Sequence, residues 1–181
     1  MEIIEAQVGT KHKIIDLPIN EGKVQPSLEN DVIKAMVMER YRGEGSFGLG
    51  FVKGFGIKEG AVASTVAHDS HNLLIIGTND EDMAYAGNIL AKEGGGMVAV
   101  KDKQVLALLP LSIAGLMSDK PVEEVAKLVD GMSKAWKELG CNIVSPFMTM
   151  ALLSLPVLPE LRLTNRGLVD TLNFKFIGIT E

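Results

Sequence analysis

The chain has little of several features that specialised proteins need. Its 181 residues include one cysteine, Cys141, which rules out an internal disulfide and favours a reducing compartment, so we predict a cytoplasmic protein. Aromatic residues make up only 5% of the chain, no run of basic residues occurs, and the formal net charge is −5. Binding to nucleic acid calls for a basic surface, so these features predict no nucleic-acid partner.

Long hydrophobic runs are also missing. The most apolar stretch, residues 147–158, is interrupted by Thr149, Ser154 and Pro156, whereas a membrane-spanning helix needs about 20 consecutive apolar residues. The first residues lack the basic and apolar regions of a signal peptide. The sequence therefore predicts no membrane contact. Residues 147–158 are expected either to lie in the protein's own core or to cover a partner surface.

What is present is the composition of an ordinary globular protein. Hydrophobic residues make up 46% of the chain and charged residues 23%, and no repeat or long linker divides it, so we predict one domain over residues 1–181. Apolar runs bounded by turn residues predict several strands. These runs are residues 12–19, 47–57, 61–67 and 72–78, and residues 31–40 fit either a strand or a helix.

Helical periodicity occurs in two segments. The first helix is predicted to begin at Thr78, which forms a capping-box pattern with Glu81, and to end at residues 94–96. The second is predicted between residues 119 and 140, with Gly140 as its C-cap. The expected apolar face of the first helix consists of Met83, Ala86, Gly87 and Leu90. That of the second consists of Val122, Val125, Leu128, Val129, Met132, Trp136 and Leu139.

The order of the elements predicts the fold class. A hairpin is expected between the helices, at residues 97–111, and the tail at residues 161–179 is expected to be irregular apart from a final strand. Strands and helices are mixed without a regular βαβ repeat. We therefore predict an α+β fold, with mixed or antiparallel β-sheet layers packed with two or three helices.

The predicted strand at residues 47–57 is unusual because glycine occupies four of its five even positions. Side chains alternate between faces along a strand, so one face is apolar apart from Lys53 and the other is almost bare backbone. A bare face lets another backbone or a flat ligand approach closely. Lys53 is expected either to turn to solvent at a bulge or to contact an anion or carbonyl at the rim of a pocket.

The stretch AHDSHN, residues 67–72, holds two of the three histidines in the chain. His68 and His71 would point to opposite faces of a strand and converge only if the segment turns. Three interpretations stay open. His68, Asp69 and His71 hold a metal ion; or Asp69 orients a histidine for proton transfer with Ser70 as a relay; or Asp69, Ser70 and Asn72 satisfy backbone donors in a polar turn.

Three long strings resemble the C-terminal domain of bacterial and archaeal adenine deaminases. They are GLGFVKGFGIKEGAVASTVAHDSHNLLIIGTNDEDM, LPLSIAGLMSD and ELGCNIVSPFMTMALLSLPVLPELRLTNRGLVD, and the resemblance extends from about Ile14 to the end of the chain. Residues 68–72 match the family pattern. Tyr41 and Arg42 stand where many family members have two histidines.

The resemblance implies hydrolysis of adenine to hypoxanthine and ammonia. It also implies that the divalent metals of the family (Mn, Fe or Zn) are held in an amidohydrolase barrel that precedes this domain and is not part of this sequence. A barrel needs about 200 residues or more, so we expect no metal site and no cofactor in this chain. The predicted catalytic residues are His68, Asp69 and His71, and the predicted substrate contacts are Lys53, Ser70 and Asn72.

Two function classes follow from the resemblance. In the first, the chain assists deamination of a purine base beside an amidohydrolase barrel subunit supplied in trans. In the second, it is a non-catalytic module that binds a purine or serves assembly. A homo-oligomer is expected in either case.

Overall fold

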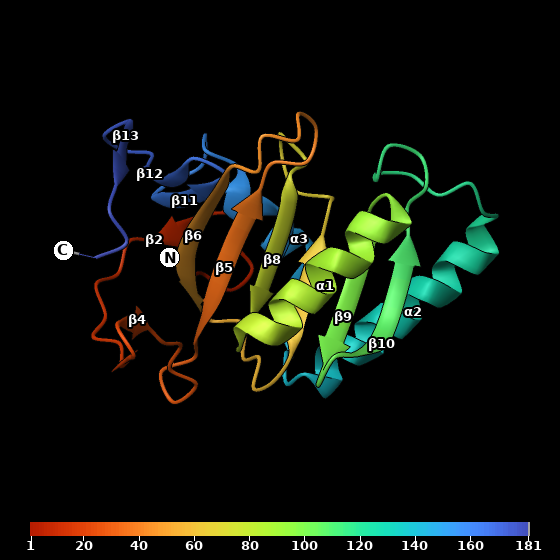
Figure 1. The fold of residues 1–181 in the computed structure, drawn as a ribbon, viewed down its shortest axis with the longest axis horizontal. Coiled ribbons are helices and arrows are strands. Elements are labelled where there is room, and N and C mark those ends of the chain that lie inside the picture. Colours follow the sequence, from red (N-terminus) through yellow and green to blue (C-terminus); the bar gives the residue numbers. More distant parts are fainter. Residues whose placement is uncertain (181) are drawn as a thin grey trace.

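The computed structural model describes residues 1–180, which form an α+β fold with three sheets (Figure 1). The largest sheet of this region has eight strands in the order β10-β9-β7-β8-β5-β6-β1-β2, and all neighbours are antiparallel except β1 and β6. Its strands are β1 (Glu2–Ile3), β2 (Thr10–Lys11), β5 (Val32–Met38), β6 (Phe47–Lys53), β7 (Ala61–Ser64), β8 (Leu73–Gly77), β9 (Gly96–Lys101) and β10 (Gln104–Pro110).

The smaller elements complete the fold. A three-stranded antiparallel sheet contains β11 (Leu161–Thr164), β12 (Gly167–Asp170) and β13 (Lys175–Ile177), and a short hairpin contains β3 (Ile19–Asn20) and β4 (Lys23–Val24). The helices are α1 (Asp80–Glu93), α2 (Val122–Glu138), α3 (Pro146–Ala151) and the 3-10 turn η1 (Leu152–Ser154). This architecture confirms the predicted class. None of the helices in residues 1–180 has the length and apolarity that a membrane span requires.

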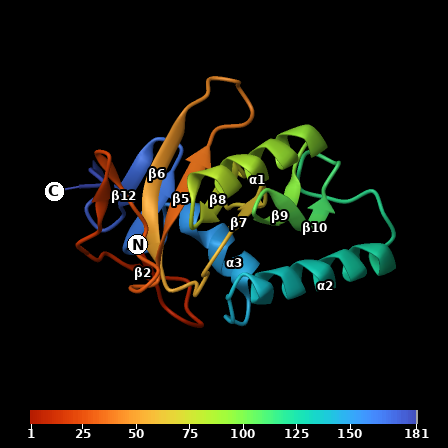
Figure 2. The same ribbon diagram turned by 60° about the horizontal axis from the view of Figure 1, so that its bottom comes forward.

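Helices cover both faces of the large sheet (Figure 2). On one face, α1 packs on β7, β8 and β9 through Met83, Ala86 and Leu90. On the other face, α2 and α3 contribute Trp136 and Met150 to the larger core. Strands β11 and β12 close that core at the β6 end of the sheet. On the face of the sheet that α1 covers, α1 does not extend as far as β6. The odd side chains of β6 are therefore partly exposed there, with Phe47 52% and Leu49 50% exposed.

The even face of β6 is the buried one. A Cβ built at Gly48 would lie 2.1 Å from the Thr164 carbonyl oxygen and 2.8 Å from the Gly167 nitrogen. Real Cβ atoms do not approach backbone so closely, so only glycine permits this contact. The close approach of a second backbone, one of the two occupants expected for the bare face, is confirmed. Of the apolar side chains of β6, Phe47 and Leu49 point outward, whereas Val52 is buried on the even face.

A buried arginine anchors the start of the small sheet. Arg162 is 1% exposed. Its guanidinium donates to four carbonyl oxygens, those of Val8, Leu152, Leu158 and Pro159, over 2.6–3.0 Å. Burial lowers the pKa of Arg162 to about 10, which leaves it charged at neutral pH. The N-terminal segment, η1 and β11 are thereby held together.

Several local predictions were wrong. Residues 12–18 form no strand, since β2 ends at Lys11 and β3 begins at Ile19, and Ile14 is 70% exposed. The final strand expected in the tail is present as β13, but the part expected to be irregular forms β11 and β12, because β6 offers it a glycine surface. Periodicity within the tail alone does not show that surface.

The helix predictions were nearly correct. The N-cap of α1 is Asn79 rather than Thr78: its side chain accepts the Asp82 N–H, and its own amide donates to the Asp82 carboxylate at 3.0 Å. Gly94 ends α1 as predicted. In α2 the C-cap is Leu139, with Gly140 following at a φ of 102°.

Two apolar segments are buried only in part. On α2, Met132, Trp136 and Leu139 are buried as predicted, whereas Val122 and Val129 are 72% and 42% exposed. In residues 147–158 the core takes up Met150, Ala151 and Leu153, whereas Met148 and Val157 are 53% and 74% exposed.

The contact at Gly48 gives a first prediction. We expect Gly48→Ala to lower the free energy of unfolding by about 3 kcal/mol or more, because β11 and β12 must move to admit a methyl group. Gly131→Ala is the matched control: it lies within α2 with nothing within 4 Å of the new Cβ, and alanine should raise stability by up to about 1 kcal/mol. Urea unfolding measures both. A Gly48→Ala protein as stable as the parent would contradict the close contact.

Candidate functional site

Three connections meet at one end of the large sheet. Met38, the last residue of β5, pairs with Leu73 of β8 on one side and with Phe47 of β6 on the other. The connections at residues 39–46 and 65–72 therefore lie at the same end of the sheet. The turn between β11 and β12 joins them: the Asn165 amide donates to the Ser46 hydroxyl at 3.0 Å. The AHDSHN stretch is therefore part of one of three loops that meet here.

The AHDSHN segment forms a turn closed by His71. The His71 N–H donates to the Ala67 carbonyl at 2.7 Å, and the Ala67 N–H donates to His71 Nδ1 at 3.3 Å. His71 has a φ of 50°, in the left-handed region. The two histidine rings meet edge to face with centroids 5.4 Å apart. The segment turns and the two histidines converge, as the sequence predicted for a turn.

Arg40 fixes this turn from outside. Its Nε donates to the His71 carbonyl at 2.6 Å and its Nη2 to the Ala114 carbonyl at 2.7 Å. Tyr41 adds a hydroxyl that donates to the same His71 carbonyl at 3.1 Å, and its ring lies 4.5 Å from the Arg40 guanidinium. Ser154 holds the other side by donating to the His68 carbonyl at 2.9 Å.

The surroundings of His71 disfavour its protonated form. Burial, together with the neighbouring His68 ring and the Arg40 guanidinium, lowers the pKa of His71 below its usual 6.5. Asp69 acts in the opposite direction but is outweighed. Because Nδ1 accepts the Ala67 N–H, the neutral ring carries its proton on Nε2.

A cavity of about 600 Å³ opens beside the turn. Asp69 and Ser70 contribute one wall, and Asn165 and Arg166 of the β11–β12 turn contribute another. Phe174 and Phe176, which are 88% and 52% exposed, line it as well. The volume is typical of small-molecule sites. A carboxylate, a hydroxyl and a guanidinium beside aromatic rings suit a flat polar ligand.

The structure brings together only some of the predicted site residues. Asp69 and Ser70 line the cavity and His68 and His71 flank it, whereas Asn72 is 5% exposed and donates to the Asn165 side chain at 3.4 Å. Lys53 lies at the opposite end of β6, about 20 Å away over six residues of strand. Its ammonium donates to the Asn30 carbonyl at 2.8 Å, so it takes no part in this cavity.

The residues present do not fit a divalent metal ion. Within residues 1–180, no three histidine, cysteine, aspartate or glutamate side chains gather to hold one. Nδ1 of His71 is occupied by the Ala67 N–H, which leaves His68, Asp69 and His71 short of a convergent set of donors. The interpretation of AHDSHN as a metal site was therefore wrong.

Comparison with known proteins agrees with the resemblance noted in the sequence. The family profile described as "Adenine deaminase C-terminal domain" matches residues 7–175. The chain belongs to this family. It is 69% identical over 179 residues to an adenine deaminase of Moorella thermoacetica and 62% identical over 179 residues to one of Clostridium botulinum. An adenine deaminase of Brucella abortus is 46% identical over 176 residues.

These adenine deaminases are much longer than the chain. The matched regions cover 97–99% of this chain and 30% of each relative. The chain therefore spans about 30% of the length of the relatives that it matches and corresponds to their C-terminal domain.

Reasoning from the sequence missed Arg40, Asn165 and Arg166. Arg40 is half-buried, and its donors are used within the protein. Asn165 and Arg166 lie in the string TNRG between two apolar runs. That pattern signals a hairpin turn and would have predicted β11 and β12 as well.

The Arg40 contacts predict the behaviour of His71. In an NMR titration, we expect His71 to protonate below pH 6.5 and its pKa to rise in Arg40→Met, which removes one of the three causes that lower it. Because the folded pKa lies below the unfolded one, the contribution of His71 to stability is present above about pH 6.5 and is lost as the pH falls through the folded pKa. Loss of the two carbonyl contacts should also cost about 1–3 kcal/mol.

Arg42→Met is the matched control for Arg40→Met. The Arg42 side chain is 76% exposed and lies 3.8 Å from the Glu44 carboxylate, away from His71. We expect it to change neither the His71 titration nor the free energy of unfolding by a measurable amount. The account of this turn fails if His71 titrates at or above pH 6.5, or if the two arginine variants shift it equally.

Proposed function

We propose that this chain is the accessory domain of an adenine deaminase, and that it assists the hydrolysis of adenine to hypoxanthine and ammonia beside a larger domain that holds the metal. The observation that carries the proposal is the match itself: 69% identity over 99% of this chain, but over only 30% of an adenine deaminase. The proposed partner is the amidohydrolase barrel that the resemblance implies, with a divalent metal (Mn, Fe or Zn).

The cavity supplies the proposed contact with the purine. Adenine presents an amino donor beside ring-nitrogen acceptors, and the Asp69 carboxylate and Ser70 hydroxyl offer groups of the complementary kinds. The Arg166 guanidinium and the exposed Phe174 and Phe176 rings can lie against a flat base. In this proposal Asp69 and Ser70 contact substrate, while His71 positions their turn. Catalytic roles for His68, Asp69 and His71 stay predictions.

The exposed aromatic side chains also support a partner at this end of the fold. Phe174 is 88% exposed and adjoins the cavity, and large apolar groups gathered in this way mark binding surfaces. A neighbouring domain that covers them would exclude water from the purine. The expected homo-oligomer and cytoplasmic location stay predictions.

Reconstitution tests the proposal. We expect this chain, mixed with the remaining N-terminal part of the Moorella thermoacetica adenine deaminase, to co-elute with it and to release ammonia from adenine at least tenfold faster than either component alone. Manganese, iron and zinc should be supplied in separate assays. If the two parts neither co-elute nor release ammonia faster together, the accessory role is wrong.

The cavity itself favours a second candidate, a purine-binding module without catalysis. A thermal-shift panel of adenine and hypoxanthine on this chain alone separates the two functions. Stabilisation by a base, together with a failed reconstitution, would select the binding module.

A further inference from the structure

The outer edge of β6 is only partly paired. The Met1 amine donates to the Phe51 carbonyl at 2.9 Å, the Lys53 N–H donates to the Met1 carbonyl at 2.8 Å, and Glu2 pairs in parallel with Lys53. Backbone groups alternate in direction along a strand, so the odd residues of β6 face this edge and the even ones face β5. Within residues 1–180, no strand pairs with the edge at Leu49 or Phe47.

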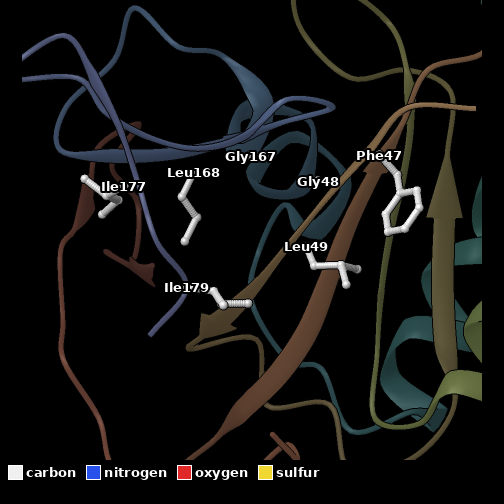
Figure 3. Close-up of a pocket in the computed structure, with 7 residues that line it drawn as sticks. All are labelled: Phe47, Gly48, Leu49, Gly167, Leu168, Ile177 and Ile179. Carbon is white, nitrogen blue, oxygen red and sulfur yellow. The ribbon is translucent and has the colours of Figure 1, made fainter. Parts of the chain in front are cut away.

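An apolar groove runs along this unpaired part (Figure 3). Phe47 and Leu49 form one side, and Leu168, Ile177 and Ile179 approach from the other. The groove has a volume of about 320 Å³ and is lined by seven residues, none of them charged. Phe47, Leu49 and Ile179 are 47–52% exposed.

The combination of a free strand edge and an apolar groove fits an extended polypeptide. The free N–H and C=O groups of an edge strand pair with the backbone of an added strand, whose alternate side chains fill neighbouring pockets. A small apolar ligand would fill the groove but leave these backbone groups unpaired.

The pairing of Met1 indicates where such a strand comes from. Met1 is 7% exposed, and its nitrogen donates to β6 as the N–H of a continuing strand would. Burial lowers the pKa of this amine to about 6, so the position disfavours a charged group. A peptide N–H carries no charge and would suit the position better. The chain belongs to a family of C-terminal domains and matches 30% of the length of an adenine deaminase. In that relative, the rest of the polypeptide therefore precedes the position of Met1.

We propose that the outer edge of β6 binds the extended segment that precedes the position of Met1 in full-length adenine deaminases, as an upstream continuation of β1 parallel to β6. In this register, the residue two places before Met1 donates to the Leu49 carbonyl and accepts the Phe51 N–H. The residue four places before donates to the Phe47 carbonyl and accepts the Leu49 N–H. The inference rests on the proposed function only in joining this domain to a longer polypeptide and needs no catalysis.

Grafting tests this pairing. The six residues that precede the matched region in the Moorella thermoacetica relative are fused to the N-terminus of this chain, and amide hydrogen exchange is followed by NMR. The Phe51 and Leu49 amides should exchange at least tenfold more slowly in the grafted chain, while the Val105 amide of β10 is unchanged. If the Phe51 and Leu49 amides exchange as fast as in the ungrafted chain, the proposal is overturned whatever the outcome of reconstitution.

Two controls identify the cause of any protection. In a graft with proline two and four places before Met1, the N–H groups that would donate to β6 are replaced by rings that block the approach of the strand, so the graft should not pair and should protect neither amide. Leu49→Lys in the grafted chain should abolish protection of Phe51, whereas Val122→Lys, at a 72% exposed site on α2, should preserve it. If the ungrafted chain shows the same protection, increasing with protein concentration, a second copy occupies the edge and the proposal is wrong.

Discussion

The close contact between two backbones at Gly48 determines both surface features of this domain. Because the buried face of β6 carries almost no side chains, the β11–β12 turn lies directly on the sheet, with the Thr164 carbonyl where a Cβ would otherwise be. The turn thereby brings Asn165 and Arg166 beside Asp69 and Ser70, which creates the cavity. The same alternation points Phe47 and Leu49 outward, which creates the groove.

The second constraint is that Arg40 and His71 hold the AHDSHN turn in place. Arg40 uses its donors on the His71 and Ala114 carbonyls, and the pKa of His71 is lowered while its Nδ1 accepts the Ala67 N–H. The turn is therefore held in a defined shape while Asp69 and Ser70 remain exposed at the cavity. A domain that presents fixed polar groups, but gathers no set of metal ligands within residues 1–180, fits the accessory role proposed here.

Local patterns predicted the α+β class, the hairpin of β9 and β10, and α1 and α2 within a few residues. These features depend on hydrophobic periodicity and helix capping, which involve only residues close together in the sequence. The glycine row of β6 predicted a close approach but not its partner. That partner, the TNRG turn, lies more than a hundred residues away, and nothing in its own sequence indicates what it contacts. For the same reason Lys53 was grouped with the AHDSHN residues, although the length of β6 separates them.

The steady-state kinetics of a reconstituted or full-length adenine deaminase carrying this domain test the central claim most directly. If Asp69 contacts the purine at the cavity, Asp69→Asn should lower kcat/KM for adenine at least tenfold, a loss of about 1.4 kcal/mol or more of transition-state stabilisation. Lys53→Met, at the far end of β6, should change kcat/KM less than twofold. Equal effects of the two substitutions, or none from Asp69→Asn, would contradict the assignment of this cavity to the purine.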